Sequence, residues 1–195
     1  MAYDKRIKAD SGIFEEIRFI PVGDELILKP IIPQLIQQEA MLYLFNTNNE
    51  GVEKYLPSVH ANNEEEAVKK LSEFENKMLL KQGLLYCIRF KQKQFPVGYI
   101  NLNSPLCPTG LDSWTVDFWM AESMQGKGMM TPSLYCLLAY LQERGVPEVK
   151  ALVSSDNVRS INTLERVGFE FISQEAGGER RFLYSVQLND DEFKI

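Results

Sequence analysis

The sequence predicts a mixed α/β fold, a single sheet covered by helices with one strand–helix–strand crossover at its centre. Apolar residues follow helical spacing in the first half of the chain. In the second half they indicate three strands, a helix, a strand, a helix and two strands. Hydrophobic residues make up 45% and charged residues 25%, which is typical of a globular protein with a buried core. No repeat or Pro/Ser-rich linker divides the 195 residues, so one domain over residues 1–195 is expected.

The first elements are short. Residues 14–30 predict two extended runs around a turn at Gly23 and Asp24. Residues 33–46 predict a helix, and residues 53–57 a shorter one. The apolar residues expected on the inward side of the first helix are Leu35, Leu42 and Phe45.

Residues 62–83 predict an amphipathic helix. Asn63 is a suitable N-cap, glutamates occupy the first turn, lysines follow, and Gly83 is expected to end the helix. The acidic run 64–66 is then a solvated first turn.

The central strands are predicted at residues 84–90, 97–103 and 114–120, the first two joined by a turn at 91–94. A helix follows Gly128 and ends at Gly145, with an apolar stripe that faces a sheet. This stripe consists of Leu134, Leu137, Leu138 and Leu141.

The last elements begin with a buried strand at residues 148–154. Asp156 or Asn157 then caps a short helix that Gly168 closes. Its inward residues are Ile161, Leu164 and Val167. The runs "FEFIS" and "RRFLYSVQL" predict two further strands.

Charge and composition exclude several classes of protein. The net charge of −6 argues against a nucleic-acid partner, which requires a basic face. No apolar run approaches the ~20 residues of a membrane span, and the N-terminus lacks the apolar core of a signal peptide. The odd number of widely spaced cysteines suits neither a disulfide framework nor a zinc site. We expect free thiols, a cytoplasmic protein, and no membrane partner.

The stretch "MQGKGMM" at residues 124–130 lies between a strand and a helix. Glycines before a helix allow its unpaired N–H groups to converge on phosphate oxygens, and Lys127 could add positive charge. Pro132 is tolerated in the first turn, where its missing N–H has no helical partner. A tight turn without a ligand is the more common explanation of a lone Gly-x-Gly. A Walker loop is excluded because Gly128 follows the lysine, and the dinucleotide fingerprint because Thr131 stands where its third glycine belongs.

Three segments together resemble the GNAT superfamily of acetyl-CoA-dependent N-acetyltransferases, in particular its RimJ/RimL-type branch. Gln125-x-x-Gly128 within "FWMAESMQGKGMMTPSL" is similar to the family's pyrophosphate loop, although Met130 departs from the usual final glycine or alanine. "SSDNVRSINTLERVGFEFI" resembles the branch's second motif, and "LFNTNNEGVEKYLP" its N-terminal helix pair. The resemblance covers roughly residues 24–188 and leaves 1–23 as an N-terminal extension.

The resemblance implies a mostly antiparallel twisted sheet, acetyl-CoA as co-substrate and no metal. It implies that backbone of Trp119 and Met120 polarises the thioester carbonyl, and that Asn157 orients cofactor amides or a hydroxyl. The pyrophosphate is expected on the backbone N–H groups of the loop, which are those of Gln125, Gly126, Lys127, Gly128, Met129 and Met130.

The acid and the base are less clearly marked. The tyrosine that protonates the leaving thiolate in many relatives is replaced by Leu164, and the branch suggests Ser160 instead. A helix first-turn role for Ser160 and a capping role for Asn157 are the alternatives. The usual strand carboxylate position holds Thr115, whereas Asp117 lies two residues further on the same face. Asp117 is therefore a candidate base, with an ordinary solvated carboxylate as the alternative; the lone His60 is expected to be a surface residue.

The expected activity is transfer of an acetyl group to a primary amine by direct attack, in a monomer or homodimer. The acceptor is an α-amine of a protein N-terminus or a small molecule, because no strong base is evident. The alternatives are a non-catalytic acetyl-CoA-binding sensor or scaffold and a purely structural domain. The acceptor's identity depends on residues 50–64 and 101–113, which carry no recognisable code.

Overall fold

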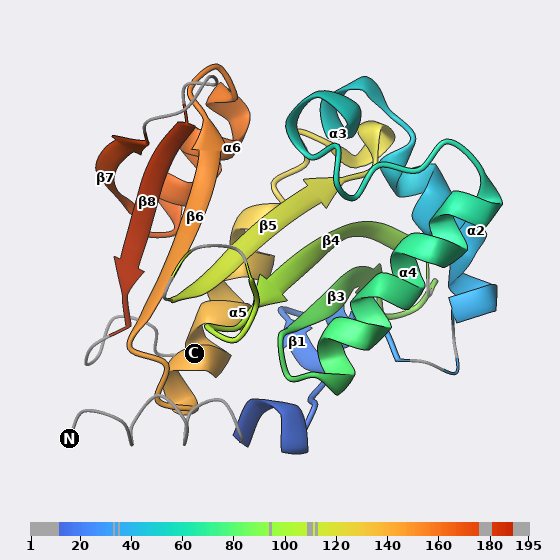
Figure 1. Ribbon diagram of the computed structural model, residues 1–195, viewed down its shortest axis with the longest axis horizontal. Coiled ribbons are helices and arrows are strands. Elements are labelled where there is room, and N and C mark those ends of the chain that lie inside the picture. The colour runs from blue at the N-terminus through green and yellow to red at the C-terminus, as the bar shows by residue number, and fades with distance from the viewer. Residues whose placement is uncertain are drawn as a thin grey trace.

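The computed structural model describes residues 12–32, 34, 36–93, 95–108, 111, 113–175 and 181–188. These residues form an eight-stranded sheet with the order β1-β2-β3-β4-β5-β6-β8-β7 (Figure 1). The strands are β1 (Ile20–Val22), β2 (Leu26–Pro30), β3 (Gly83–Phe90), β4 (Pro96–Asn103), β5 (Trp114–Met120), β6 (Glu148–Ser154), β7 (Glu170–Glu175) and β8 (Arg181–Gln187). The helices are α2 (Ile36–Thr47), α3 (Glu50–Tyr55), α4 (Glu64–Leu79), the 3-10 helix η2 (Glu122–Met124), α5 (Met130–Glu143) and α6 (Val158–Arg166).

The predicted mixed sheet and its central crossover are confirmed. Neighbouring strands pair antiparallel except β5 and β6, which are parallel and connected through α5. Helices α2 and α4 lie on one face of the sheet, and α5 lies on the other (Figure 1). None of the helices among the described residues is long and apolar enough to cross a bilayer.

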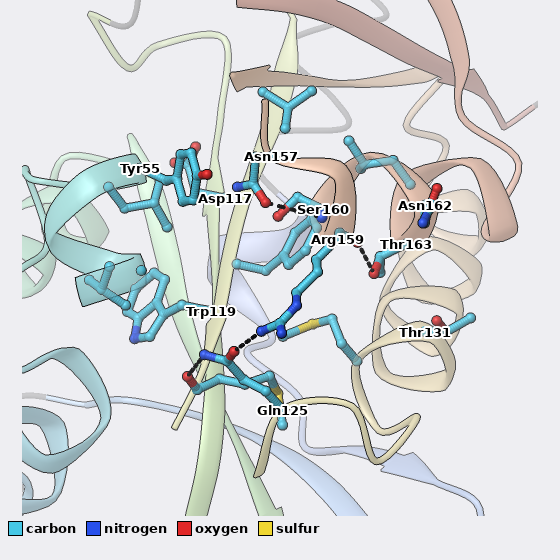
Figure 2. Close-up of a pocket in the computed structure, with 18 of the residues that line it drawn as sticks. Tyr55, Asp117, Trp119, Gln125, Thr131, Asn157, Arg159, Ser160, Asn162 and Thr163 are labelled. Atoms are coloured by element: carbon cyan, nitrogen blue, oxygen red, sulfur yellow. Dashed lines mark hydrogen bonds between the residues drawn. The ribbon is translucent and has the colours of Figure 1, made fainter. Parts of the chain in front are cut away.

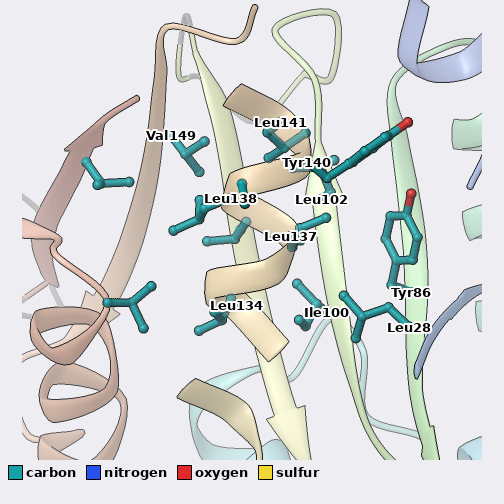
Figure 3. Close-up of a cluster of buried hydrophobic side chains, with 14 of the residues drawn as sticks. Leu28, Tyr86, Ile100, Leu102, Leu134, Leu137, Leu138, Tyr140, Leu141 and Val149 are labelled. Carbon is teal, nitrogen blue, oxygen red and sulfur yellow. The ribbon is translucent and has the colours of Figure 1, made fainter. Parts of the chain in front are cut away.

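The larger core lies between α5 and the sheet. The four leucines predicted to face the sheet are fully buried, and they pack against Ile100, Leu102 and Val149 (Figure 3). The other face carries an aromatic cluster in which Tyr99 stacks on Trp119 at 5.5 Å between ring centroids. Trp119 thus packs the C-terminal half of β5 against the residues of this cluster.

Strands β5 and β6 pair over a short distance only. Their register joins Trp114 to Val149 and Thr115 to Lys150, and no later pair follows among the described residues. Strand β4, by contrast, accompanies β5 as far as Met120. The backbone edge of β5 beyond Thr115 is therefore open toward β6, and the two strands diverge there (Figure 1).

The inward side predicted for the first helix is wrong at Phe45, which is 53% exposed. Helix α2 instead buries Ile36, Ala40 and Tyr43, a stripe of i, i+4, i+7 spacing that turns Phe45 to the opposite side. Leu42 is only partly buried, and Leu35 lies outside the described residues.

Several predicted boundaries also shift. Residues 12–15 form a helical turn where an extended run was expected, and α3 begins three residues earlier, after the cap Asn49. Helix α4 ends at Leu79, while Gly83 begins β3. A Cβ on Gly83 would lie 2.7 Å from the carbonyl oxygen of Leu102, so this glycine permits close approach of two strands.

Candidate active site

A cavity of about 780 Å³ opens where β5 and β6 diverge (Figure 2). Its walls are the C-terminal halves of both strands, the loop 124–131, helix α6 and one side of α3. The backbone edge of β5 that does not pair with β6 therefore lines the cavity. An extended ligand that carries amide groups could pair with this edge as another strand would.

The glycine loop brings a helix start to this cavity. Gly126 and Gly128 have φ of +74° and +73°, a backbone conformation that favours glycine. Helices α3, α4 and α6 each have an asparagine side chain that caps the first turn. At α5 the N-cap position is Met129, which makes no side-chain capping bond. The N–H groups at the start of α5 are thus available to an anion in the cavity.

Gln125 connects the glycine loop to both walls of the cavity. Its Nε2 is 3.5 Å from the carbonyl oxygen of Met120 at the end of β5, and its Oε1 accepts a hydrogen bond of 2.8 Å from Nη1 of Arg159. Arg159 extends from α6 across the cavity toward the loop (Figure 2). A guanidinium group in this position is suited to a phosphate oxygen.

The polar side of α6 was not identified from the sequence. Its residues follow i, i+3, i+4, i+7 spacing and all line the cavity; they are Arg159, Asn162, Thr163 and Arg166. The sequence does contain this polar side, because the four residues lie on the part of the helix away from the apolar residues Ile161 and Leu164. Together with Lys127, the two arginines give this end of the cavity a positive character in a chain of net charge −6.

Asn157 and Ser160 occupy the first turn of α6. Asn157 Oδ1 accepts a hydrogen bond of 3.3 Å from the backbone N–H of Ser160, so the capping role considered for Asn157 is present. The Ser160 side chain lines the cavity, and its hydroxyl group makes no hydrogen bond to the residues that the structure describes. That hydroxyl is consequently available to a ligand.

Asp117 lines the cavity from the C-terminal half of β5. Nδ2 of Asn101 donates to its Oδ2 over 3.0 Å, and Nδ2 of Asn103 is 3.4 Å from the same oxygen. Burial raises the pKa of Asp117 above its ordinary value, although both amides and the charges of Lys77 and Arg181 oppose this effect. A carboxyl group with a raised pKa at a cavity wall is suited to accepting a proton.

Helix α3 forms another wall of the cavity. Tyr55 lines the wall, and its hydroxyl oxygen accepts a hydrogen bond of 3.0 Å from Lys54 Nζ. The same Nζ is paired at 2.7 Å with Asp156, in the loop before α6. This exposed ion pair connects the two halves of the molecule on either side of the diverging strands.

The structure brings every predicted site residue to this one cavity. Asp117, Trp119, Met120, Asn157 and Ser160 line it, as does the whole loop 125–130. His60 and Thr115 do not line it. The roles assigned to these residues stay predictions. Arg159, Arg166 and Tyr55 are cavity residues that the sequence analysis missed.

Comparisons with known proteins agree with the fold. Residues 25–170 match the family model "Acetyltransferase (GNAT) domain". A RimL ribosomal L7/L12 α-N-protein acetyltransferase in complex with coenzyme A is 22% identical, with a TM-score of 0.73 over 89% of this chain and 100% of that chain. The Salmonella typhimurium acetyltransferase that modifies the N-terminal serine of L7/L12 is 21% identical, with a TM-score of 0.71 over 87% and 99%.

The microcin C7 self-immunity acetyltransferase MccE, in complex with acetyl-CoA and AMP, is 22% identical, with a TM-score of 0.69 over 85% of this chain and 94% of that chain. No curated protein matches the chain. Likeness at these identities shows a shared fold, whereas the family model spans most of the sequence. The chain belongs to the GNAT family of acetyltransferases.

Proposed function

We propose that this protein transfers an acetyl group from acetyl-CoA to an α-amine, of a protein N-terminus or a small molecule, by direct attack. The observation that carries the proposal is the cavity between the diverging strands, which joins an uncapped helix start to an open strand edge. The chain also belongs to a family of acetyltransferases, and related folds have been solved with coenzyme A or acetyl-CoA.

The residues present fit acetyl-CoA. Its pyrophosphate suits the N–H groups at the start of α5 and the guanidinium of Arg159. Its pantetheine amides suit the open backbone edge of β5, up to Trp119 and Met120. When bound, the thioester supplies an activated acetyl group with a good leaving thiolate. No metal site is proposed, and no group of three or more ligating side chains occurs among the described residues.

Two side chains are proposed to transfer protons, and a third to position one of them. Asp117 takes the proton of the attacking amine, since it lines the cavity and its pKa is raised. Ser160 offers its hydroxyl to the departing sulfur from the first turn of α6. Asn157 holds that turn in place through its bond to the Ser160 N–H. Asp117 and Ser160 come from opposite walls, so the acetyl carbon would lie between them.

The choice of acceptor is tested by competition. An α-amine has a reference pKa of about 8 and a lysine amine about 10.4, so about a tenth of the former is neutral at pH 7 and far less of the latter. A single partly buried carboxylate is a modest base, which favours the more easily deprotonated amine. We expect peptides with a free N-terminus and an internal lysine to be acetylated first at the N-terminus, as located by tandem mass spectrometry.

The matched control peptide has a blocked N-terminus and the same lysine. Faster acetylation of lysine than of the α-amine at pH 7 would contradict the proposed acceptor. Tight binding of acetyl-CoA with no turnover over a panel of amines would instead favour a sensor or scaffold.

Replacing Ser160 with alanine tests the proposed acid. A positioned proton donor contributes about 10²–10⁴-fold, and a weakly basic thiolate needs the least help, so we expect kcat to fall by about 100-fold or less. Affinity for acetyl-CoA, measured by calorimetry, should stay nearly unchanged, because Ser160 is not part of the glycine loop that is proposed to hold the pyrophosphate. Ser173→Ala, on exposed β7 outside the cavity, is the control. An unchanged kcat in Ser160→Ala would reduce Ser160 to a helix first-turn residue.

A further inference from the structure

Two asparagines lie opposite the polar residues of β5. In the antiparallel pairing of β4 with β5, Asn101 faces Asp117 and Asn103 faces Thr115. All of these side chains are on the sheet face that carries the aromatic cluster of Tyr99 and Trp119, since residues alternate along each strand. These four residues therefore form a polar patch next to the aromatic cluster.

The two carboxylate oxygens of Asp117 differ in their hydrogen bonds. Asn101 and Asn103 both donate to Oδ2, at 3.0 and 3.4 Å. Oδ1 receives no hydrogen bond from the residues that the structure describes, and it is not among the buried atoms that lack a partner. Asp117 lines the cavity, and Oδ1 is its oxygen that keeps its full capacity to accept a hydrogen bond from a ligand.

Asn101 is an unfavourable residue for the core. It is 3% exposed, its Nδ2 also donates to Asn103 Oδ1 over 3.3 Å, and its own Oδ1 is buried without a partner. An apolar side chain of similar size at this position would avoid the desolvation of an unpaired amide oxygen. A local conflict of this kind is expected where a side chain serves a site rather than the core.

We propose that Asn101 is a positioning residue for Asp117, holding Oδ2 against the sheet so that Oδ1 faces the amine in the cavity. The proposal rests on the proposed function, in which Asp117 is the base. Asn103 supports the arrangement: its Oδ1 accepts from Asn101 and lies 3.4 Å from Lys77 Nζ, while its Nδ2 also reaches Thr115 Oγ1 at 3.2 Å.

The same contacts set the protonation of Asp117. Hydrogen bonds to the ionised form of a carboxyl group lower its pKa, and burial raises it. The charged or titratable groups that surround Asp117 are Lys77 from α4, Arg181 from β8 and the buried thiol of Cys107, which is 3.6 Å from Asn103 Oδ1. Burial raises the pKa of Asp117, and the hydrogen bond from Asn101 lowers it. The pKa should therefore rise further when the Asn101 donor is removed.

The test is a ¹³C NMR titration of the Asp117 carboxyl carbon in Asn101→Leu, with the resonance assigned by its loss in Asp117→Asn. A lost hydrogen bond to a charged group corresponds to an increase of about one pH unit in the midpoint. At a pH below the wild-type midpoint, where both proteins are mostly protonated at Asp117, kcat/KM should be about tenfold lower in the variant than in wild type. Recovery is expected on raising the pH.

Asn46 provides a matched control. It is a fully buried asparagine of α2 whose Nδ2 donates to Leu42 and whose Oδ1 also lacks a partner, and it lies outside the cavity lining. Asn46→Leu removes an equally buried amide and should leave the Asp117 midpoint unchanged. If Asn101→Leu does not fold, Asn101→Val replaces it, because β-branched residues suit a strand.

An Asp117 midpoint in Asn101→Leu equal to that of wild type would overturn the proposal. An equal change of the Asp117 midpoint in Asn46→Leu would also overturn the proposal, since loss of any buried amide would then produce the effect. Failure of the proposed function is distinguishable: Asp117→Asn would retain the wild-type rate, whatever the titration of the Asn101 variant showed.

Discussion

Replacing Gly128 with valine is expected to weaken acetyl-CoA binding by more than about 100-fold, which corresponds to the loss of two charge-assisted hydrogen bonds. Gly128 has φ of +73°, where a β-branched residue is strained. The loop would relax to negative φ and turn its N–H groups away from the start of α5. Isothermal calorimetry with acetyl-CoA measures the loss, and the thermal transition of the variant shows that the fold persists.

Gly145 is a matched control for backbone strain. Its φ is +74°, a Cβ at either glycine would meet no atom within 4 Å, and Gly145 follows the opposite end of α5 outside the cavity. Gly145→Val should lose comparable stability and retain affinity. A folded Gly128→Val with wild-type affinity would remove the loop from the proposed binding site.

Asp117→Asn is expected to lower kcat about 10²–10⁴-fold, the usual contribution of a positioned base. The asparagine keeps the size of the side chain and cannot take the proton of the amine. Acetyl-CoA affinity should be unaffected, because Asp117 belongs neither to the glycine loop nor to the polar side of α6, which are proposed to hold the phosphates.

The free energy of unfolding of Asp117→Asn, compared with that of wild type at pH 7, shows whether Asp117 has a structural role. The folded-state pKa of Asp117 is raised, so the native state binds its proton more tightly than the unfolded chain does. Ionisation of Asp117 therefore disfavours folding above that pKa, and the neutral asparagine should be as stable as wild type at pH 7, or more so. A large loss of stability together with the loss of turnover would indicate a structural role, and unchanged turnover would exclude Asp117 as the base.

Strong periodicity made most of the fold predictable. The leucine stripe of α5 was assigned to the correct face, and the bounds predicted for β5 and β6 were correct, because a continuous run of apolar or aromatic residues marks each of these elements. Helix α2 was misjudged because its polar and apolar residues are mixed around the helix. Burial of Glu39 against Arg89 shows that an ion pair, rather than an apolar stripe, sets part of its inward face.

Some residues of the candidate site could be found from the sequence, and others could not. The glycine loop, Asn157 and Ser160 were found from contiguous motifs, in which the chemistry and the spacing occupy one stretch of chain. Arg159 and Arg166 were present as a hydrophilic stripe, but a polar helix side usually faces solvent, so the stripe alone did not indicate a cavity.

By itself, the sequence determined the order of elements, the crossover through α5 and the glycine-opened helix start, since these depend on local backbone preference and apolar spacing. Only the tertiary structure decided where β5 and β6 separate, and therefore that the unpaired strand edge and the uncapped helix meet in one cavity. It also decided that Asn101 stands opposite Asp117. Register between strands depends on the packing of whole faces against their helices, and no short stretch of sequence contains that information.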